Sequence, residues 1–494
     1  MVMKRLEDSM EERKRKLQEI VKAKVRPYAY RFEKTHDIKE ILKKHGKIKS
    51  GRKLPRQKVS IAGRIKSVRK HGKLIFAHLE DCSGRMQICL EYGTIGRKDF
   101  DFFDNVNVGD FIGVHGFILK TIKGELSVWV KKMEFLTKSL RPLPAEWYGL
   151  KDIELRYRQR YIDLLMNPGV REVFEKRNRI IDAIREFMAS RGFVEVDTPV
   201  LQPIYGGTHA RPFKSHLNSL DMPVYMRISN ELYLKRLLVG GYEKVFEFSK
   251  DFRNEGIDKT HNPEFMQVET MWAYADYRDN MKFCEDMISY IAKKVLGTTG
   301  VKRGDHVINF KPPWKRIRFI DAIRKYAGID FDKVADFEGA KGEAKKKNVD
   351  VSKCRSVAEV MIAAFENLVQ PKLIQPTLVY DYPAEMYELA KVSRTDQRFA
   401  EAFEPIINGW EIGLSYCEQN DPEVLRKKWE REEKEFGKGD FEAQRMDEDF
   451  LRALEYGMPP TSGLGIGVDR LVMLLTGTSS IRDVILFPFM RPEG

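Results

Sequence analysis

Short segments that alternate apolar and polar residues dominate residues 58–137. Polar, glycine-containing turns such as KHGK, CSGR and IKGE separate five of them. Alternation with a period of two is typical of half-buried strands, and turns of this composition join strands. Five short strands with one helical interruption predict a small Greek-key β-barrel of the oligonucleotide-binding (OB) kind.

Other segments have a helical period. Residues 170–190 carry one apolar stripe that stops before Gly192, which predicts an amphipathic helix. Residues 4–24 are highly charged with weak apolar periodicity, and we expect a helix there too. A lysine-dense, helix-rich piece spans about residues 330–370, and the last third of the chain returns to strand-like segments.

A strand pattern flanks the polar loop FRNEGIDKTHNPEF, with KVFEFSKDF before it and EFMQVETMWAY after it. Two strands joined by such a loop predict an antiparallel hairpin. Residues two apart on a strand share a face, so we expect Arg253 and Glu255 to point the same way, as do Phe265, Gln267 and Glu269. A cation, acids and an aromatic ring on one surface suit a flat, negatively charged ligand.

Positive charge is concentrated at one end of the 494-residue chain. Residues 1–75 hold 25 Lys/Arg against 8 Asp/Glu, which leaves 62 and 65 in the remainder, so this excess indicates a polyanion partner such as nucleic acid. No run of eighteen apolar residues occurs, the N-terminus lacks an apolar signal region, and the five cysteines form no CxxC pair. A cytoplasmic protein with reduced thiols is expected.

Three stretches, RGFVEVDTPVL (191–201), FRNEGIDKTHNPEF (252–265) and GLGIGVDRLVML (463–474), resemble in order the three motifs of class II aminoacyl-tRNA synthetases. Phrases such as GGTHARPF, ELYLKRLLVGG and ALEYGMPPT resemble the lysyl-tRNA synthetase family of subclass IIb. The resemblance implies an α+β fold: a catalytic domain with an antiparallel sheet flanked by helices, preceded by an OB-fold barrel. The expected divisions are a basic helical extension (1–54), an anticodon-binding barrel (55–142), a linker (143–157) and a catalytic domain (158–494).

The resemblance also implies roles for residues around ATP. Arg253 is expected to bind both the amino acid carboxylate and the α-phosphate, and Arg470 to cap the nucleotide from the other side. Mg²⁺ is expected on Glu404 and Glu411, because carboxylate oxygens suit this cation. The other expected ATP-binding residues are Glu255, His261, Asn262, Phe265, Gly463, Gly465 and Gly467.

The family's lysine site maps onto a second set of residues. Gly207 and Glu231 match positions that hold the α-ammonium group, and Arg253 holds the carboxylate. Glu269 and Glu418 match acids around the side chain, with Glu418 the expected partner of the ε-ammonium group, and Tyr416 walls the aliphatic stem. Strict alternation would place Glu411 and Glu418 on opposite faces, so a bulge or bend between them is expected.

Further family positions concern macromolecular partners. Arg69, Phe76 and Gln87 match anticodon-contacting positions on the barrel, where an aromatic ring can stack on a splayed base. Pro199 matches the dimer interface of the first motif. The expected partners are therefore tRNA(Lys) and a second copy of the chain, and no membrane.

Four residues near the substrates differ from the usual family residues: Asn230 replaces proline, Met271 tyrosine, Ala402 arginine and Leu414 asparagine. The expected activity is lysine activation followed by transfer to tRNA. Two alternatives stay open, namely a sister synthetase for aspartate or asparagine, and a synthetase-like paralogue that modifies a protein or only binds RNA.

Overall fold

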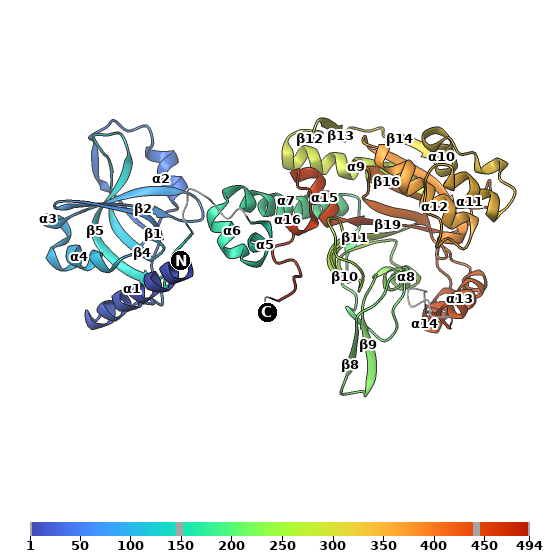
Figure 1. The fold of residues 1–494 in the computed structure, drawn as a ribbon, viewed down its shortest axis with the longest axis horizontal. Coiled ribbons are helices and arrows are strands. Elements are labelled where there is room, and N and C mark those ends of the chain that lie inside the picture. Colours follow the sequence, from blue (N-terminus) through green and yellow to red (C-terminus); the bar gives the residue numbers. More distant parts are fainter. Residues whose placement is uncertain (1, 145–151, 438–444, 493–494) are drawn as a thin grey trace. The chain divides into compact units, whose positions relative to one another are not determined.

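The structure is a computed structural model that describes residues 2–144, 152–437 and 445–492. The chain divides into two compact units, Met1–Lys151 and Asp152–Gly494 (Figure 1). The division falls within the expected linker; residues 145–151 of that linker lie outside the described residues, and its last part begins α5 (Ile153–Arg158). None of the described helices is long and apolar enough to cross a membrane.

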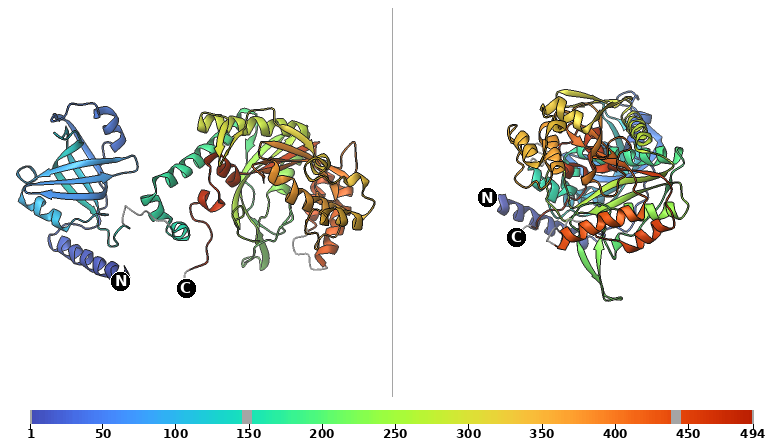
Figure 2. Two further views of the ribbon diagram at one scale, coloured as in Figure 1. Left: turned by 45° about the horizontal axis from the view of Figure 1, so that its top comes forward. Right: turned by 90° about the vertical axis from the view of Figure 1, so that its right-hand side faces the viewer.

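The first unit is built around a closed five-stranded barrel, which confirms the fold predicted from the alternation. The strand order is β1–β2–β3–β5–β4 (Figures 1 and 2). The first half of β1 pairs with β4 and its second half with β2, so this one long strand closes the barrel. The bounds are β1 Lys53–His71, β2 Leu74–Glu80, β3 Arg85–Glu91, β4 Phe111–Lys120 and β5 Leu126–Thr137, with α3 (Tyr92–Ile95) and α4 (Arg97–Phe102) as the helical interruption.

The N-terminal helices α1 (Val2–Lys22) and α2 (Ile38–His45) pack against this barrel. Ile20 of α1 and Ile38 of α2 are fully buried and belong to the same core as the barrel strands. Arg13 donates hydrogen bonds to the carbonyl oxygens of Ser139 and Val108, both at 3.0 Å. The basic N-terminal residues are therefore fixed to the barrel rather than separate from it.

The second unit contains a nine-stranded, mainly antiparallel sheet among its described residues. Its path is β14–β15–β16–β18–β19–β11–β10–β6, with β17 paired to β16, and only the two edge pairs β14–β15 and β6–β10 are parallel. The bounds are β6 Val194–Glu195, β10 Lys244–Phe252, β11 Glu264–Ala273, β14 Lys315–Arg318, β15 Thr377–Pro383, β16 Phe399–Ile407, β17 Trp410–Glu411, β18 Gly413–Cys417 and β19 Thr461–Gly467.

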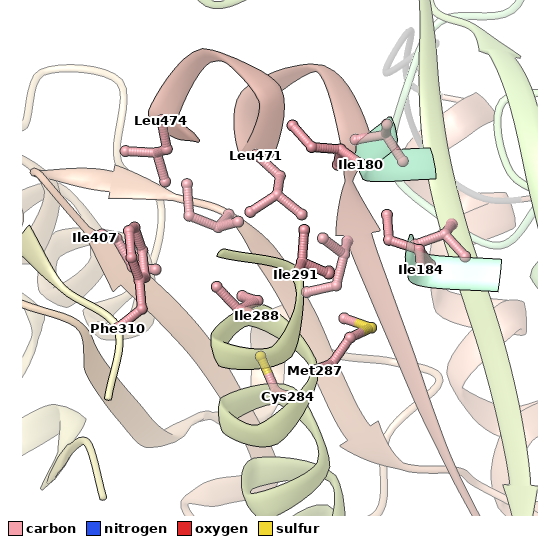
Figure 3. Close-up of a cluster of buried hydrophobic side chains, with 14 of the residues drawn as sticks. Ile180, Ile184, Cys284, Met287, Ile288, Ile291, Phe310, Ile407, Leu471 and Leu474 are labelled. Atoms are coloured by element: carbon pink, nitrogen blue, oxygen red, sulfur yellow. The ribbon is translucent and has the colours of Figure 1, made fainter. Parts of the chain in front are cut away.

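Helices α7 (Pro168–Ser190), α9 (Tyr277–Leu296) and α15 (Val468–Thr476) form the largest core with this sheet. Figure 3 shows Ile180 and Ile184 facing Met287, Ile288 and Ile291 of α9, with side chains of α15 closing the cluster. The amphipathic stripe predicted for residues 170–190 is thus the buried face of α7.

The remaining elements of the second unit surround the sheet. The helix-rich piece expected near 330–370 is present and has its own core with β15 and β16. A three-stranded sheet, β7–β9–β8, projects from the rest of the unit (Figures 1 and 2). The bounds are α6 Arg160–Met166, β7 Leu201–Gln202, β8 Lys214–Leu217, β9 Met222–Met226, α8 Glu231–Val239, β12 Gly300–Arg303, β13 His306–Asn309, α10 Phe319–Ala327, α11 Phe337–Lys345, α12 Val357–Leu368, α13 Pro422–Gly437, α14 Glu448–Glu455 and α16 Ile481–Val484.

A one-residue register shift separates β17 from β18. Phe403 of β16 pairs with Ser415, whereas Ile406 pairs with Glu411, so two residues on β16 face three on the returning side. This extra residue is the irregularity expected between Glu411 and Glu418. The β16–β17 turn is Asn408–Gly409, and both residues have positive φ, 56° and 74°, as in the tight turns that join twisted strands.

Candidate active site

A cavity of about 320 Å³ lies on the central strands of the second unit. Elements distant in sequence line it: the loop before α8, the β10–β11 hairpin, β18, β19 and the start of α15. Its lining includes every expected ATP- and lysine-binding residue except Glu404. Glu404 lines an adjacent cavity of about 430 Å³, to which Glu411, His261 and Arg470 also contribute.

Arg253 and Glu255 both line the cavity, but strand alternation is not the reason. Strand β10 ends at Phe252, so both residues lie in the loop and the predicted shared strand face is wrong. The loop is held instead by its backbone, because the amide of Arg253 donates to the carbonyl of Pro263 at 2.9 Å. The Arg253 guanidinium lies 5.0 Å from the ring centre of Phe265, a cation–π distance.

Alternation does hold on β11. Gln267 pairs with Gly467, Glu269 with Gly465, and Met271 with Gly463 of β19, so side chains stand opposite residues that have none. A Cβ built on Gly463 would lie 2.3 Å from Oε1 of Glu418. The glycines of the third motif therefore leave the space in which the side chains of β11 and Glu418 form the cavity floor.

The second and third motifs meet through His261, Arg470 and Glu411. Arg470 Nη1 donates to the carbonyl oxygen of Glu411 at 2.8 Å, and Nη2 lies 3.1 Å from Nε2 of His261. Nδ1 of His261 lies 2.8 Å from Oδ2 of Asp258. Burial alone would raise the pKa of Asp258, but hydrogen bonds from Thr260 and His261 outweigh it and lower the pKa to about 2. A fixed anion thus orients the imidazole towards Arg470. Asn262 is buried behind this loop, and its side-chain amide donates to the carbonyl oxygen of Glu264 at 2.6 Å.

The carboxylate of Glu404 is half-buried and lies between two tyrosines. Tyr382 and Tyr387 donate hydroxyl hydrogen bonds to its two oxygens, at 2.8 and 2.7 Å. Burial, followed by the negative charge of Glu411, raises the pKa of Glu404 to about 8, despite these hydrogen bonds. Glu366 lines the same cavity, and its pKa is raised by burial and by Glu411. Gathered carboxylates with raised pKa values match the oxygen donors that a hard divalent cation takes.

The other end of the first cavity is acidic. Glu231, Glu269 and Glu418 are all buried. Burial first, and then the charges of Glu231, Asp251 and Glu418, raise the pKa of Glu269 well above its usual range. Burial likewise raises the pKa of Glu418 to about 8. This end of the cavity therefore suits a ligand that carries more than one positive charge.

Gly207 and Tyr416 lie beside these acids. Gly207 has a φ of 93°, in the left-handed region that favours glycine, and an added Cβ would be 2.9 Å from the Ser229 hydroxyl. The Tyr416 hydroxyl donates to Oε1 of Glu231 at 2.6 Å. Burial, followed by the charges of Glu231 and Glu418, raises the pKa of Tyr416 well above its usual range, so it remains a donor.

The four residues that differ from the family pattern occupy distinct environments. Met271 is buried and Leu414 half-buried, and both line the cavity. Ala402 is fully buried in the core and pairs with Tyr416 across β16 and β18. Asn230 precedes α8, and its amide nitrogen donates to Oε2 of Glu247 at 2.8 Å, so it has a buried polar role that proline could not fill.

The barrel residues lie on one outer face of the first unit. Arg69 of β1 pairs with Phe76 of β2, and Phe76 pairs with Cys89 of β3. Gln87 lies two residues before Cys89 on β3 and therefore on the same face of the sheet. Arg69 is exposed and Phe76 half-buried, whereas its neighbours Ile75 and Ala77 point into the core. Gln87 is buried and donates to Oε2 of Glu125 at 2.5 Å. The three side chains thus share a surface, but Gln87 is already paired.

Pro199 is exposed in the segment between β6 and β7. Three apolar neighbours are also exposed: Val194 by 46%, Val200 by 37% and Leu201 by 55%. Strand β6 is at the edge of the large sheet. This segment presents an exposed apolar surface on the described chain.

Sequence reasoning missed several residues that shape the site. Lys235 lies four residues after Glu231, a spacing that brings side chains together on a helix, and this signal was available. Asp469 accepts a hydrogen bond from the Met266 amide at 2.7 Å and one from Arg177 at 2.5 Å, tying α15 to β11 and α7. Tyr382 and Tyr387 lie far from Glu404 in sequence, and only the fold reveals their contact.

Known families match both units. The family described as tRNA synthetases class II (D, K and N) matches residues 152–491, and the family described as OB-fold nucleic acid binding domain matches residues 59–136. A lysine–tRNA ligase of Carboxydothermus hydrogenoformans is 49% identical over 488 residues, with 99% of each chain covered. Lysine–tRNA ligases of Bacillus cytotoxicus and Moorella thermoacetica are 47% and 46% identical, with 98% of each chain covered.

Proposed function

The chain belongs to the lysine–tRNA ligase family of class II tRNA synthetases, and from this membership we propose that it activates L-lysine with ATP and transfers it to the 3′-hydroxyl of the terminal adenosine of tRNA(Lys). The charge distribution in the cavity supports this proposal independently of family membership. The cavity has two arginines at one end and three buried carboxylates at the other, which complements an anionic nucleotide and a dicationic amino acid.

Activation joins the lysine carboxylate to ATP. The carboxylate oxygen attacks the α-phosphorus in line, the new O–P bond forms, and the bond to the leaving pyrophosphate breaks. Arg253 contacts both the carboxylate and the α-phosphate, while Arg470 and His261 bind the phosphate tail. The carboxylate is already ionised at neutral pH, so the residues act by positioning the two substrates and by offsetting charge.

The nucleotide is bound between the two motifs. Phe265 stacks on the adenine ring, Glu255 and Asn262 lie at its polar edge, and Gly463, Gly465 and Gly467 leave room for it. Glu404 and Glu411 hold Mg²⁺, and when bound this ion neutralises phosphate charge. The half-buried Glu404 supports this assignment, because the nearby negative charge of Glu411 helps to raise its pKa and a bound cation would offset that charge.

Lysine is held at the acidic end. Glu231 and the backbone at Gly207 bind the α-ammonium group, Tyr416 contacts the aliphatic stem, and Glu418 with Glu269 binds the ε-ammonium group. Charge-assisted hydrogen bonds in a desolvated pocket discriminate strongly against amino acids that lack the second ammonium group.

The same proposal covers partners and location. Arg69, Phe76 and Gln87 contact the anticodon, where Gln87 exchanges its bond to Glu125 for one to RNA. The exposed apolar residues around Pro199 are covered in a homodimer, as burial of such a surface favours. The enzyme works in the cytoplasm.

Amino-acid-dependent ATP–pyrophosphate exchange, measured with each of the twenty amino acids, tests the proposal. Lysine should support exchange at least ~100-fold better than any amino acid without a second ammonium group, as expected for a buried polar recognition site. Preference for aspartate or asparagine, or no exchange with any amino acid, would contradict it. Charging of tRNA(Lys) transcripts tests the second step.

A further inference from the structure

Lys235 is a buried ammonium group inside the acidic end of the cavity. It lies on α8, is 1% exposed, and stands one helical turn after Glu231. Its Nζ pairs with Oε1 of Glu231 and lies 2.5 Å from Oε2 of Glu418. A cation of the protein thus joins two of the acids that are proposed to bind the substrate's ammonium groups.

This arrangement leaves one oxygen of each acid open. Oε1 of Glu231 accepts hydrogen bonds from Lys235 and from the Tyr416 hydroxyl, and no hydrogen bond to Oε2 occurs among the described residues. Neither buried oxygen of Glu418 has a hydrogen-bond partner in the described structure; Oε2 forms the ion pair with Lys235, and Oε1 faces Gly463. Lys235 therefore fixes one side of each carboxylate and leaves the other side for a ligand.

Electrostatics keep Lys235 charged. Burial alone would lower the pKa of its ammonium group, but the charges of Glu231 and Glu418 outweigh burial and raise the pKa. In the other direction, Lys235 lowers the pKa of both Glu418 and Glu269 relative to what burial alone would give. The lysine and the acids thus stabilise one another in their ionised forms.

The charges of the pocket can be counted. When Glu231, Glu269 and Glu418 are all ionised, as a bound dication favours, their three negative charges and the ammonium group of Lys235 leave two negative charges. An amino acid with an α- and an ε-ammonium group supplies two positive charges, and its carboxylate pairs with Arg253. An amino acid with one ammonium group would leave a buried carboxylate uncompensated, which is costly.

We propose that Lys235 is a positioning residue that orients Glu231 and Glu418 and sets the net charge of the pocket at two negative charges, so that the pocket selects amino acids with two ammonium groups. The proposal rests on lysine activation as the function of this site. It predicts which feature of the substrate is recognised, namely the number of its ammonium groups.

Charged and titratable groups from several elements face Lys235, and all enter the pH dependence. They are Glu231 on α8, Glu269 on β11, Tyr416 and Glu418 at β18, and Lys428 on α13. The acids bind ammonium groups only when ionised. Because the pKa values of Glu269 and Glu418 are raised, kcat/KM for lysine should rise with pH through the neutral range. Loss of Lys235 raises these pKa values further, so the rise should move to higher pH.

Lys235→Met, which keeps the volume and removes the charge, tests the proposal in ATP–pyrophosphate exchange. At pH 7 the KM for lysine should increase at least ~10-fold while the KM for ATP stays within ~3-fold, because only the amino acid end is altered. The pH profile of kcat/KM for lysine should shift upward by about one unit or more. Lys235→Arg keeps the cation and should retain the profile of the parent.

A KM for lysine and a pH profile that match the parent in Lys235→Met would overturn the proposal, as would a fall in kcat alone. If Lys235→Met does not fold, Lys235→Gln removes the same charge but keeps a polar group that can hydrogen-bond to the acids. Its KM for lysine should also increase at least ~10-fold while its KM for ATP stays within ~3-fold. A folded Lys235→Gln variant with the KM for lysine and the pH profile of the parent would also overturn the proposal.

The parent enzyme separates this inference from the proposed function. If the parent does not activate lysine, the proposed function fails whatever the variants do. If the parent activates lysine and Lys235→Met behaves like it, only the role of Lys235 fails. Exchange with norleucine, which has the lysine chain without the ε-ammonium group, should remain undetectable in the parent and in Lys235→Met.

Discussion

Single side chains in this site act through charge placed where the protein excludes water. Arg253 has no carboxylate partner among the described residues, and its guanidinium lies over Phe265 with one hydrogen bond, from Nε to the Ile228 carbonyl. Such a cation is available to a substrate anion. At the other end of the cavity, the buried acids Glu231 and Glu418 already form ion pairs with Lys235. The two ends therefore differ, because the acids have a charged partner within the protein and Arg253 has none among the described residues.

Arg253→Ala should abolish adenylate formation, because it removes a preorganised contact to the group on which charge develops. The loss of one such contact costs at least ~100-fold in rate. ATP–pyrophosphate exchange measures it, and circular dichroism should show an intact fold, since Arg253 contributes little to the core. Exchange within about tenfold of the parent would contradict the assignment.

Gly463→Ala should damage lysine binding selectively. The added Cβ would lie 2.3 Å from Oε1 of Glu418 and 3.0 Å from Met271, so Glu418 must move. We expect the KM for lysine to increase by at least ~10-fold, equivalent to about 1.4 kcal/mol. Gly342→Ala on α11 is the control, because its Cβ meets nothing within 4 Å. Normal lysine kinetics in Gly463→Ala would show that the close approach of Gly463 and Glu418 has no functional role.

At the scale of elements, the strands and helices were largely predictable and the contacts between them were not. The period of the apolar residues identified the barrel strands, α7 and the β10–β11 hairpin. The exact end of β10 at Phe252 was missed, since the loop is set by a backbone bond to Pro263 rather than by side-chain pattern. Resemblance to a family, rather than periodicity, brought Glu231 and Glu418 into one site. Lys235 was missed because a lysine on an amphipathic helix is ordinarily exposed.

The β16–β17 turn and the extra residue after it orient Glu411 and Glu418 towards their cavities. Gly409→Ala places a Cβ at φ 74° and 3.3 Å from Cα of Pro371, so it should lower the free energy of unfolding by about 1–2 kcal/mol. Thermal denaturation measures the change. Asn408→Gly relieves a positive φ and should change stability by less than ~0.5 kcal/mol. Equal stability of the two variants would contradict the strained-turn interpretation.

At the scale of the whole molecule, the two units have separate cores, and we expect them to have separate tasks. The residues that line the candidate active-site cavity all belong to the second unit. Removal of residues 1–144 should therefore leave lysine-dependent exchange within ~3-fold of the parent and reduce charging of tRNA by at least ~100-fold. Loss of exchange in a well-folded fragment would show that the barrel contributes to the active site.

The basic first unit should also give the two half-reactions different salt dependences in the intact enzyme. Residues 1–75 carry 17 more basic than acidic residues, and the helices that hold part of this charge are fixed to the barrel. Binding of tRNA releases counterions from its phosphates, whereas lysine and ATP bind in a cavity largely screened from bulk ions. Between about 50 and 200 mM KCl, kcat/KM for tRNA should fall at least ~10-fold more than that for ATP in exchange. Arg69→Gln removes one positive charge from the barrel. It should lower the slope of log kcat/KM for tRNA against log salt concentration by at most about one, and it should leave the slope for exchange unchanged. Parallel salt dependences for charging and exchange would place the main tRNA contacts outside the basic unit.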